Sequence, residues 1–293
     1  MANRTTAFGR GLVLAASMAL AAVCVVGSLC PARAEEAKAL RVCADPNNLP
    51  FSNEAKAGFE NKLADMVADE LHEPVAYTWH AQRRGFIRET LKAKACDVVM
   101  GVPKQYGLVE TTIPYYRSSY VFVTRADRRL DIQSIKDARL RTLKIAVQLI
   151  GDDGVNTPPA HALAAQGITN NVTGFPVYGD YRKPNPSSDI LAAVERGDVD
   201  IAAVWGPLAG YFAKQSGGTL TISPMIDTES FAPLIFQFDM AMGVRKGDDT
   251  LRDMLDHIIT QKRPQIASLL QSFGIPVLRI PGQSASLGRD PEN

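Results

Sequence analysis

The sequence lacks the residue patterns on which the common hydrolytic and metal-dependent chemistries rest. It contains no Gly-x-Ser-x-Gly turn for an activated serine, and no pair of cysteines has the spacing of a zinc site. Asp152, Asp153 and Asn156 are oxygen ligands in a glycine-rich turn, but their spacing differs from that of a calcium loop. No two histidines lie four residues apart; the histidines are His72, His80, His161 and His257. These absences predict a protein that is not an enzyme and that holds no metal or cofactor.

A charge excess and a second long hydrophobic run are also missing. The chain has 32 Lys and Arg against 31 Asp and Glu, and residues 1–34 hold three arginines and no acid. The remainder is therefore weakly acidic, so nucleic acid is not an expected partner. After residue 34 no apolar run approaches the roughly 20 residues that span a bilayer, so no membrane span is expected.

Residues 1–34 have the pattern of a secretory signal peptide. Arg4 and Arg10 precede an uncharged run at 11–32, and Ala-Arg-Ala at 32–34 provides the small side chains that an export peptidase requires. The alternative is a membrane anchor, but alanine, serine and glycine dilute the run. We expect cleavage after Ala34 and export of the rest of the chain.

Two cysteines, Cys43 and Cys96, remain in the exported chain. An oxidising compartment favours a disulfide between them. If both lay on neighbouring parallel strands, however, an offset of two or three residues at about 3.3 Å each would place their Cα atoms too far apart. The sequence therefore leaves two alternatives open, a disulfide and two small buried side chains.

Residues 189–212 carry the pattern of a helix that leads into a buried parallel strand. Apolar side chains recur at helical spacing until Gly197, which ends the helix, and residues 201–204 have the composition of a buried strand. Trp205 stands at the carboxyl end of that strand, where ligands bind in open α/β sheets. The same order appears at 86–102, and two such units predict two α/β lobes.

Alternating strand and helix patterns continue along the rest of the chain. The charged segment 125–141 is the expected first crossing between the lobes, and 236–244 is the expected return. The predicted fold is two-lobed, each lobe a mainly parallel sheet flanked by helices, with two crossover strands. The predicted organisation is a signal peptide at 1–34, a first lobe at 35–124 and 236–281, an inserted second lobe at 125–235, and a disordered tail at 282–293.

Three stretches resemble a known family. They are residues 40–53 (LRVCADPNNLPFSN), 96–103 (CDVVMGVP) and 204–212 (VWGPLAGYF). Together with the order of the elements, they are similar to the type 2 periplasmic solute-binding proteins, and within these to the J proteins of methanol oxidation. The resemblance covers essentially the whole exported chain. It implies a periplasmic location and, as a partner, a PQQ-dependent quinoprotein methanol dehydrogenase.

Departures from the wider family bear on the ligand. Amino-acid receptors of this fold usually bind the ligand carboxylate with an arginine about ten residues before the Pro-Tyr-Tyr tyrosine, where this chain has residues 104–107, Lys-Gln-Tyr-Gly. Their ammonium-binding acid follows the Gly-x-Val-Asp strand, where this chain has Trp205. An amino acid would leave both charges unpaired in a buried site, so it is not an expected ligand.

The candidate cleft residues lie at strand ends and at helix starts. Each also has a structural interpretation: turn chemistry at 45–48, core packing of the tyrosine pair, packing between lobes of the aromatics around Trp205, and an ordinary helix cap at Thr157. An arginine group at 83–88 and the loop 181–184 are possible partner contacts or plain solvated surface. The candidates are Asp45, Asn47, Asn48, Phe51, Tyr106, Tyr115, Tyr116, Thr157, Trp205 and Tyr211.

Three functions compete. The first is an accessory protein that assists the assembly or activation of the methanol dehydrogenase by direct contact. The second is a receptor of an ABC-type importer that captures a small solute other than an amino acid in the cleft between the lobes. The third is an enzyme such as a dehydratase, which would need a carboxylate or imidazole in the cleft; the sequence pattern indicates none.

Overall fold

The computed structural model describes residues 38–150 and 156–281, which belong to one compact unit. The predicted signal peptide with its cleavage site after Ala34, the predicted tail, and Asp152 and Asp153 lie outside the described residues. Within the part that is described, no helix is long and apolar enough to cross a membrane.

A parallel sheet forms the first part of the chain. The elements of this part are β1 (Leu40–Ala44), β2 (Asn47–Asn48), β3 (Ser52–Asn53), α1 (Phe59–Leu71), β4 (Val75–Trp79), α2 (Phe86–Glu89), β5 (Val98–Pro103) and β6 (Glu110–Thr111). Strands β2 and β3 form a separate antiparallel pair. β1 pairs in parallel with β4 on one side and with β5 on the other. Helix α1 buries Phe59, Leu63 and Val67, whereas Met66 and Leu71 of its predicted apolar stripe are partly buried.

Helix α2 is shorter than its sequence pattern indicates. The apolar stripe predicts a helix to Ala95, whereas the helix ends at Glu89. The Thr90 hydroxyl donates a hydrogen bond back to the Phe86 carbonyl at 2.6 Å, and Lys94 takes a left-handed conformation with φ 61°. After Thr90 the amides of Lys92 and Ala95 bond to carbonyls five residues back instead of four, so the chain continues as turns and not as a helix.

Two long strands connect the halves of the fold, β7 (Tyr116–Arg125) and β12 (Gln237–Val244). The first four residues of β7 pair with β12, and those from Tyr120 onward pair with two strands of the second half. The change of partner therefore falls inside β7, earlier than the crossing that the charges at 125–141 predict. The exact lobe boundaries stay a prediction.

The second half repeats the strand-helix order. Its elements are η1 (Ala126–Arg128), η2 (Ala138–Arg141), β8 (Ile145–Leu149), α3 (Pro158–Ala165), β9 (Val172–Pro176), η3 (Pro186–Ser188), α4 (Asp189–Arg196), β10 (Ile201–Trp205), α5 (Gly206–Gln215), β11 (Leu220–Pro224) and η4 (Thr228–Phe231). β8 pairs in parallel with β9 and β10, and β7 pairs antiparallel with β10 and β11. β11 was not expected from the sequence.

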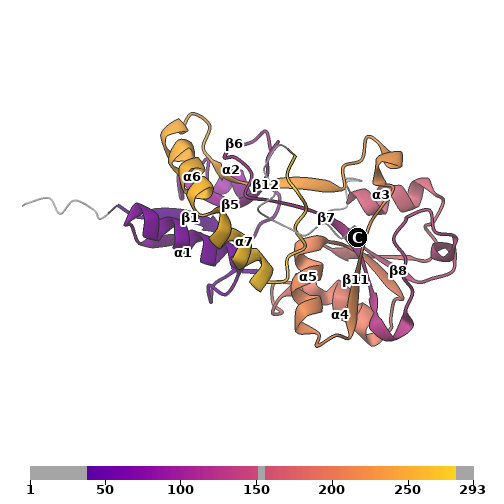
Figure 1. Cartoon of the computed structure of the whole chain (residues 1–293). Helices are drawn as coiled ribbons and strands as arrows, with labels where there is room; N and C mark the ends of the chain where they lie inside the picture. Colours follow the sequence, from indigo (N-terminus) through magenta and orange to yellow (C-terminus); the bar gives the residue numbers. More distant parts are fainter. Residues whose placement is uncertain (1–37, 151–155, 282–293) are drawn as a thin grey trace, which may run out of the picture. The chain divides into compact units, whose positions relative to one another are not determined.

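The chain then returns to the first half. Helices α6 (Asp249–Gln261) and α7 (Arg263–Ser272) contribute Leu255, Ile258 and Leu270 to the core that α1 also covers. In Figure 1 these three helices lie together beside β1 and β5. The main strand order is β4-β1-β5-β12-β7-β10-β8-β9. Strands far apart in sequence thus meet in the middle, and their ends surround the candidate site.

Candidate functional site

A cavity of about 300 Å³ lies where strand ends of the two halves meet. It opens at the carboxyl ends of β5, β8 and β10, the position that the parallel-sheet rule favours for ligands. Its volume is at the lower end of the range of small-molecule sites. The lining residues are Asn48, Phe51, Glu60, Gln82, Gly101, Pro103, Tyr120, Gln148, Ile150, Thr157, Val177, Tyr178, Ser187, Trp205, Leu208, Phe238 and Met240.

An aromatic wall around Trp205 forms one side of the cavity. Its ring lies 5.4 Å from that of Tyr120 and 5.7 Å from that of Phe238, both in edge-to-face geometry. Its backbone amide donates a hydrogen bond to Gln148 Oε1 at 2.9 Å. Trp205 therefore has a fixed place on the wall, because its backbone and its ring are both held.

Thr157 also lines the cavity, but it does not cap its helix through its side chain. Thr157 is the N-cap residue of α3, as the cap alternative predicts, but its hydroxyl donates to the Gln148 carbonyl at 2.7 Å and not to the helix. This bond ties the start of α3 to the end of β8, at the same glutamine whose side chain accepts from the Trp205 amide.

Glu60, which the sequence reasoning missed, brings a carboxyl group to the cavity. The loop 50–53 packs on the start of α1, where Glu60 N donates to the Phe51 carbonyl at 2.9 Å. A Cβ atom at Gly58 would overlap that carbonyl, and one at Gly101 would overlap the Glu60 carboxyl group, so both glycines are needed for the close approach. One feature of the sequence could have identified Glu60 as a cavity residue: it is an acid in the first turn of a helix that follows a ligand-facing loop.

Burial, and then the nearby Asp45, raise the pKa of Glu60 to about 8. Among the described residues, its carboxyl group has no hydrogen bond and no ion pair. The expectation that the cleft lacks both amino-acid counter-charges is therefore corrected: it contains one acid, supplied by α1 and not by the strand before Trp205.

The loop 179–188, which we call the closing loop, is bonded to the first half of the fold. Asp45, 2% exposed, accepts hydrogen bonds from the Tyr181 hydroxyl, the Gln82 amide and the Asn47 amide. The Asn47 side chain donates to the Lys183 carbonyl at 2.8 Å and accepts from the Asn185 amide at 2.9 Å. Asp45 and Asn47 thus hold the closing loop and do not line the cavity.

Arg83 adds a contact to the closing loop. Its guanidinium lies 4.5 Å from the centre of the Tyr181 ring, within cation–π range. Its Nη2 donates to the Gly179 carbonyl at 3.4 Å. This arginine therefore contributes to holding the loop rather than standing free on a helix face.

We predict that Tyr181→Phe will loosen the closing loop. The substitution removes only the hydroxyl that donates to Asp45, and a hydrogen bond to a charged group contributes about 1.5–3 kcal/mol. We expect faster amide hydrogen exchange at 179–188 and a free energy of unfolding lower by about 1–2 kcal/mol. The control is Tyr178→Phe, whose hydroxyl has no hydrogen bond within the described chain. Equal exchange in the two variants would contradict the assignment.

The other predicted residues take different places. Asn48 and Phe51 line the cavity, and Tyr106 lines an adjoining groove. Tyr115 and Tyr116 are at most 1% exposed and belong to the core of the first half, so the core-packing alternative holds for them. Tyr211 stacks on Phe273 at 5.8 Å and joins α5 to the segment after α7.

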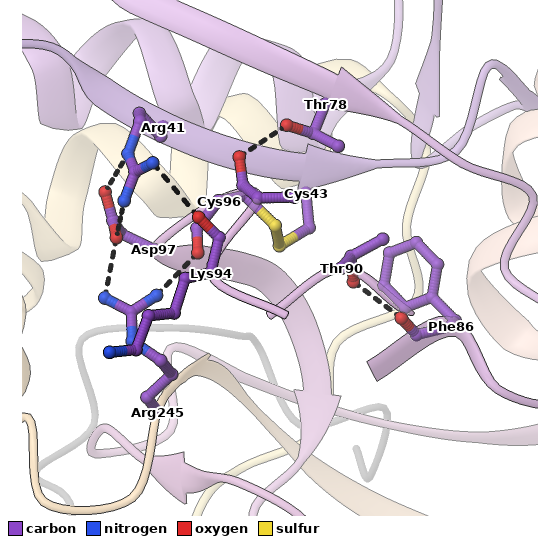
Figure 2. Close-up of a disulfide and its surroundings, with 10 residues drawn as sticks. Arg41, Cys43, Thr78, Phe86, Thr90, Lys94, Cys96, Asp97 and Arg245 are labelled. Atoms are coloured by element: carbon purple, nitrogen blue, oxygen red, sulfur yellow. Dashed lines mark hydrogen bonds and ion pairs between the residues drawn. A yellow bond between two sulfur atoms is a disulfide. The ribbon is translucent and has the colours of Figure 1, made fainter. Parts of the chain in front are cut away.

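Cys43 and Cys96 form a disulfide with a Cα separation of 5.4 Å (Figure 2). The offset argument against this bond was wrong because it assumed that both residues lie in strands. Cys43 pairs in register with Val99, but Cys96 precedes β5 and lies in the turn that brings the chain back toward β1.

An ion-pair group lies next to the disulfide. Asp97 accepts two hydrogen bonds from Arg41, at 2.6 and 2.7 Å, and one from Arg245 at 2.7 Å; Figure 2 shows the carboxylate between the two guanidinium groups. Burial opposes ionisation, but these bonds hold the pKa of Asp97 below its usual value. The group joins β1, β5 and the end of β12, so we assign it a structural role.

In the described part of the chain, no group of three or more His, Cys, Asp or Glu side chains is arranged to hold a metal ion. The site is instead an apolar cavity with one carboxyl group and several amide and hydroxyl groups. Such an arrangement suits recognition of a small group by contact and hydrogen bonding.

Comparison with known proteins shows similarity over nearly the whole chain. The model of the bacterial extracellular solute-binding proteins, family 3, matches residues 40–272. The Protein MoxJ of Methylorubrum extorquens is 31% identical over 304 residues, which cover 95% of this chain and 97% of MoxJ.

Two solved structures are also similar to this chain over most of its length. The periplasmic binding protein XoxJ from Methylobacterium extorquens AM1 is 31% identical with a TM-score of 0.68, over 82% of this chain and 100% of XoxJ. MxaJ from Methlophaga aminisulfidivorans MPT is 27% identical with a TM-score of 0.71, over 82% of this chain and 100% of MxaJ. The predicted two-lobed fold and the predicted resemblance to the J proteins are confirmed.

Proposed function

The chain belongs to family 3 of the bacterial extracellular solute-binding proteins, and from this premise we propose that it is a periplasmic accessory protein of methanol oxidation. In this role it contacts a PQQ-dependent quinoprotein methanol dehydrogenase and assists its assembly or activation. The observation that carries the proposal is the match to MoxJ, which extends over nearly the full length of both chains. Similarity of fold alone would not support a role.

The chemistry of the cavity favours this role over capture of a free amino acid. None of the described lining residues is a lysine or an arginine, so a ligand carboxylate would have no cationic partner there. Lys104, from the segment where the wider family has its arginine, donates instead to the Thr111 and Thr112 carbonyls at 3.2 and 2.9 Å. Its charge is therefore engaged outside the cavity.

The test is native mass spectrometry of the exported chain, alone and mixed with the methanol dehydrogenase of the same cells. We expect a stoichiometric complex with the apo or the holo dehydrogenase. Deletion of the gene for this chain should lower methanol oxidation. The amount of dehydrogenase polypeptide in the deletion strain is measured as a control. The proposal would be refuted if the chain formed no complex with the apo or the holo dehydrogenase and if its deletion left methanol oxidation unchanged.

A solute receptor is the second candidate, and the cavity of about 300 Å³ favours it. A ligand that binds only the folded protein raises its melting temperature. A receptor would show such a rise with one member of a panel of alcohols, organic acids and quinone precursors. It would also retain a small molecule in the native mass spectrum and form no complex with the dehydrogenase.

A further inference from the structure

The cavity carries one acidic group that has no partner among the described residues. Glu60 is the only acidic residue among the described residues that line it, and no lysine or arginine is among them. An ionised carboxylate that burial has partly desolvated is costly unless a positive charge or hydrogen-bond donors compensate it. The chain provides no such compensation within the described residues, so at pH 7 Glu60 is largely ionised only when a ligand brings a positive charge to it.

The aromatic wall of the same cavity is suited to a cation. Trp205, Tyr120 and Phe238 meet edge to face, and Phe51 lines the same cavity. Aromatic faces attract a cation by their quadrupole, most strongly when water is excluded. The same rings offer contact area to an alkyl chain.

A second polar group lacks a partner in this cavity. The Ser187 hydroxyl is buried without a hydrogen bond among the described residues, its residue is 6% exposed, and it lines the cavity. Buried hydroxyl groups in proteins are normally hydrogen-bonded. Ser187 comes from η3 in the closing loop, so a ligand that bonds to it would also contact that loop.

We propose that the cavity binds a primary alkylammonium group, with Glu60 as its carboxylate partner, Ser187 as a hydrogen-bond acceptor and the aromatic wall against its alkyl chain. The group can belong to a free amine or to a lysine side chain of a protein partner, since both present the same chemistry. The inference concerns the ligand that the cavity takes. It does not depend on contact with the dehydrogenase.

Protonation gives the proposal a signature. The groups that act electrostatically on or with Glu60 are Asp45, Tyr77, Tyr115 and Tyr116, and none is a cation. Without a bound cation, Glu60 is therefore largely protonated at pH 7, whereas an ammonium ion would stabilise the carboxylate. Binding at pH 7 should release close to one proton to the buffer.

The experiment is isothermal titration calorimetry of the exported chain at pH 7, in two buffers with different ionisation enthalpies. The probes are n-butylammonium chloride, Nα-acetyl-lysine N-methylamide and, as the neutral control, 1-butanol. We expect at least one of the amines to bind, with proton release, and 1-butanol to bind at least tenfold more weakly. Preference for n-butylammonium indicates a free amine as the natural ligand, and preference for the lysine derivative indicates a protein side chain.

The variant is Glu60→Gln, with Glu54→Gln at an exposed site as the matched control. We expect Glu60→Gln to weaken amine binding at least tenfold and to abolish proton release, while Glu54→Gln leaves both unchanged. Equal amine affinity in the wild type and Glu60→Gln would overturn the proposal, as would the absence of amine binding to the wild type. The proton release of the wild type tests the same point if Glu60→Gln does not fold.

Discussion

Replacing Cys43 and Cys96 together by alanine is expected to lower the free energy of unfolding by about 4 kcal/mol, because the disulfide closes a loop of 53 residues. A cross-link restricts the unfolded chain, and the entropy removed grows slowly with loop length. The loop contains α1, β4 and α2, so the unfolded first half would gain most of the freedom. Both sulfur atoms lie in a buried cluster, and their loss from packing adds to the effect.

Urea unfolding of the protein without residues 1–34 measures this difference. The control is the wild-type chain reduced chemically, which loses the cross-link but keeps both side chains. We expect the reduced protein to be destabilised slightly less than the double variant. Unchanged unfolding of the reduced protein, with two free thiols verified by alkylation, would contradict the prediction.

Glu60→Gln is expected to stabilise the protein at pH 8–9 and to have little effect near pH 4.5. The folded state raises the pKa of Glu60 from 4.5 to about 8, so between these values the folded protein holds a proton that the unfolded chain has released. The free energy of unfolding of the wild type therefore falls as the pH rises through this window. Glutamine carries no proton to lose and avoids this cost.

The expected gain at pH 8–9 is on the order of 2 kcal/mol. One pKa unit corresponds to about 1.4 kcal/mol, and the full value is reduced because the carboxyl group borders a cavity that solvent reaches. Thermal or urea unfolding of both proteins at pH 4.5 and 8.5 gives the difference, with Glu54→Gln as the exposed control. A constant difference between the two pH values would show that Glu60 has an ordinary pKa in the folded protein.

Much of the fold was predictable because apolar spacing reports local structure directly. The stripes of α1 and α4 and the apolar runs of β5 and β10 placed these elements to within a few residues. The misses arose where a tertiary or side-chain interaction decided the outcome. The turns that follow Glu89 lead to Cys96 and its disulfide with Cys43, and the change of partners inside β7 depends on strands that follow far along the chain.

The site was predicted only in part. Residues at the carboxyl ends of strands, such as Trp205, could be placed because that edge is a general property of parallel sheets. Tyr115 and Tyr116 stand just before a crossing between the lobes, so they were predicted to line the cleft. The motif does not determine the direction of their rings, which are buried in the core. Glu60 was not predicted to line the cavity, because an acid in the first turn of a helix is common. Its position there depends on Gly58 and Gly101, which allow the close approach of the chain.

The sequence by itself determined the alternation of strands and helices, the two-lobed α/β class and the resemblance to the J proteins, because each of these is encoded in local patterns and motifs. Only the tertiary structure decided which side chains share the cavity, that the closing loop bonds to Asp45 and Asn47, and that Cys43 reaches Cys96. These contacts join residues 53 to 138 positions apart. No local spacing rule specifies contacts at such separations, because they follow from the packing of whole elements.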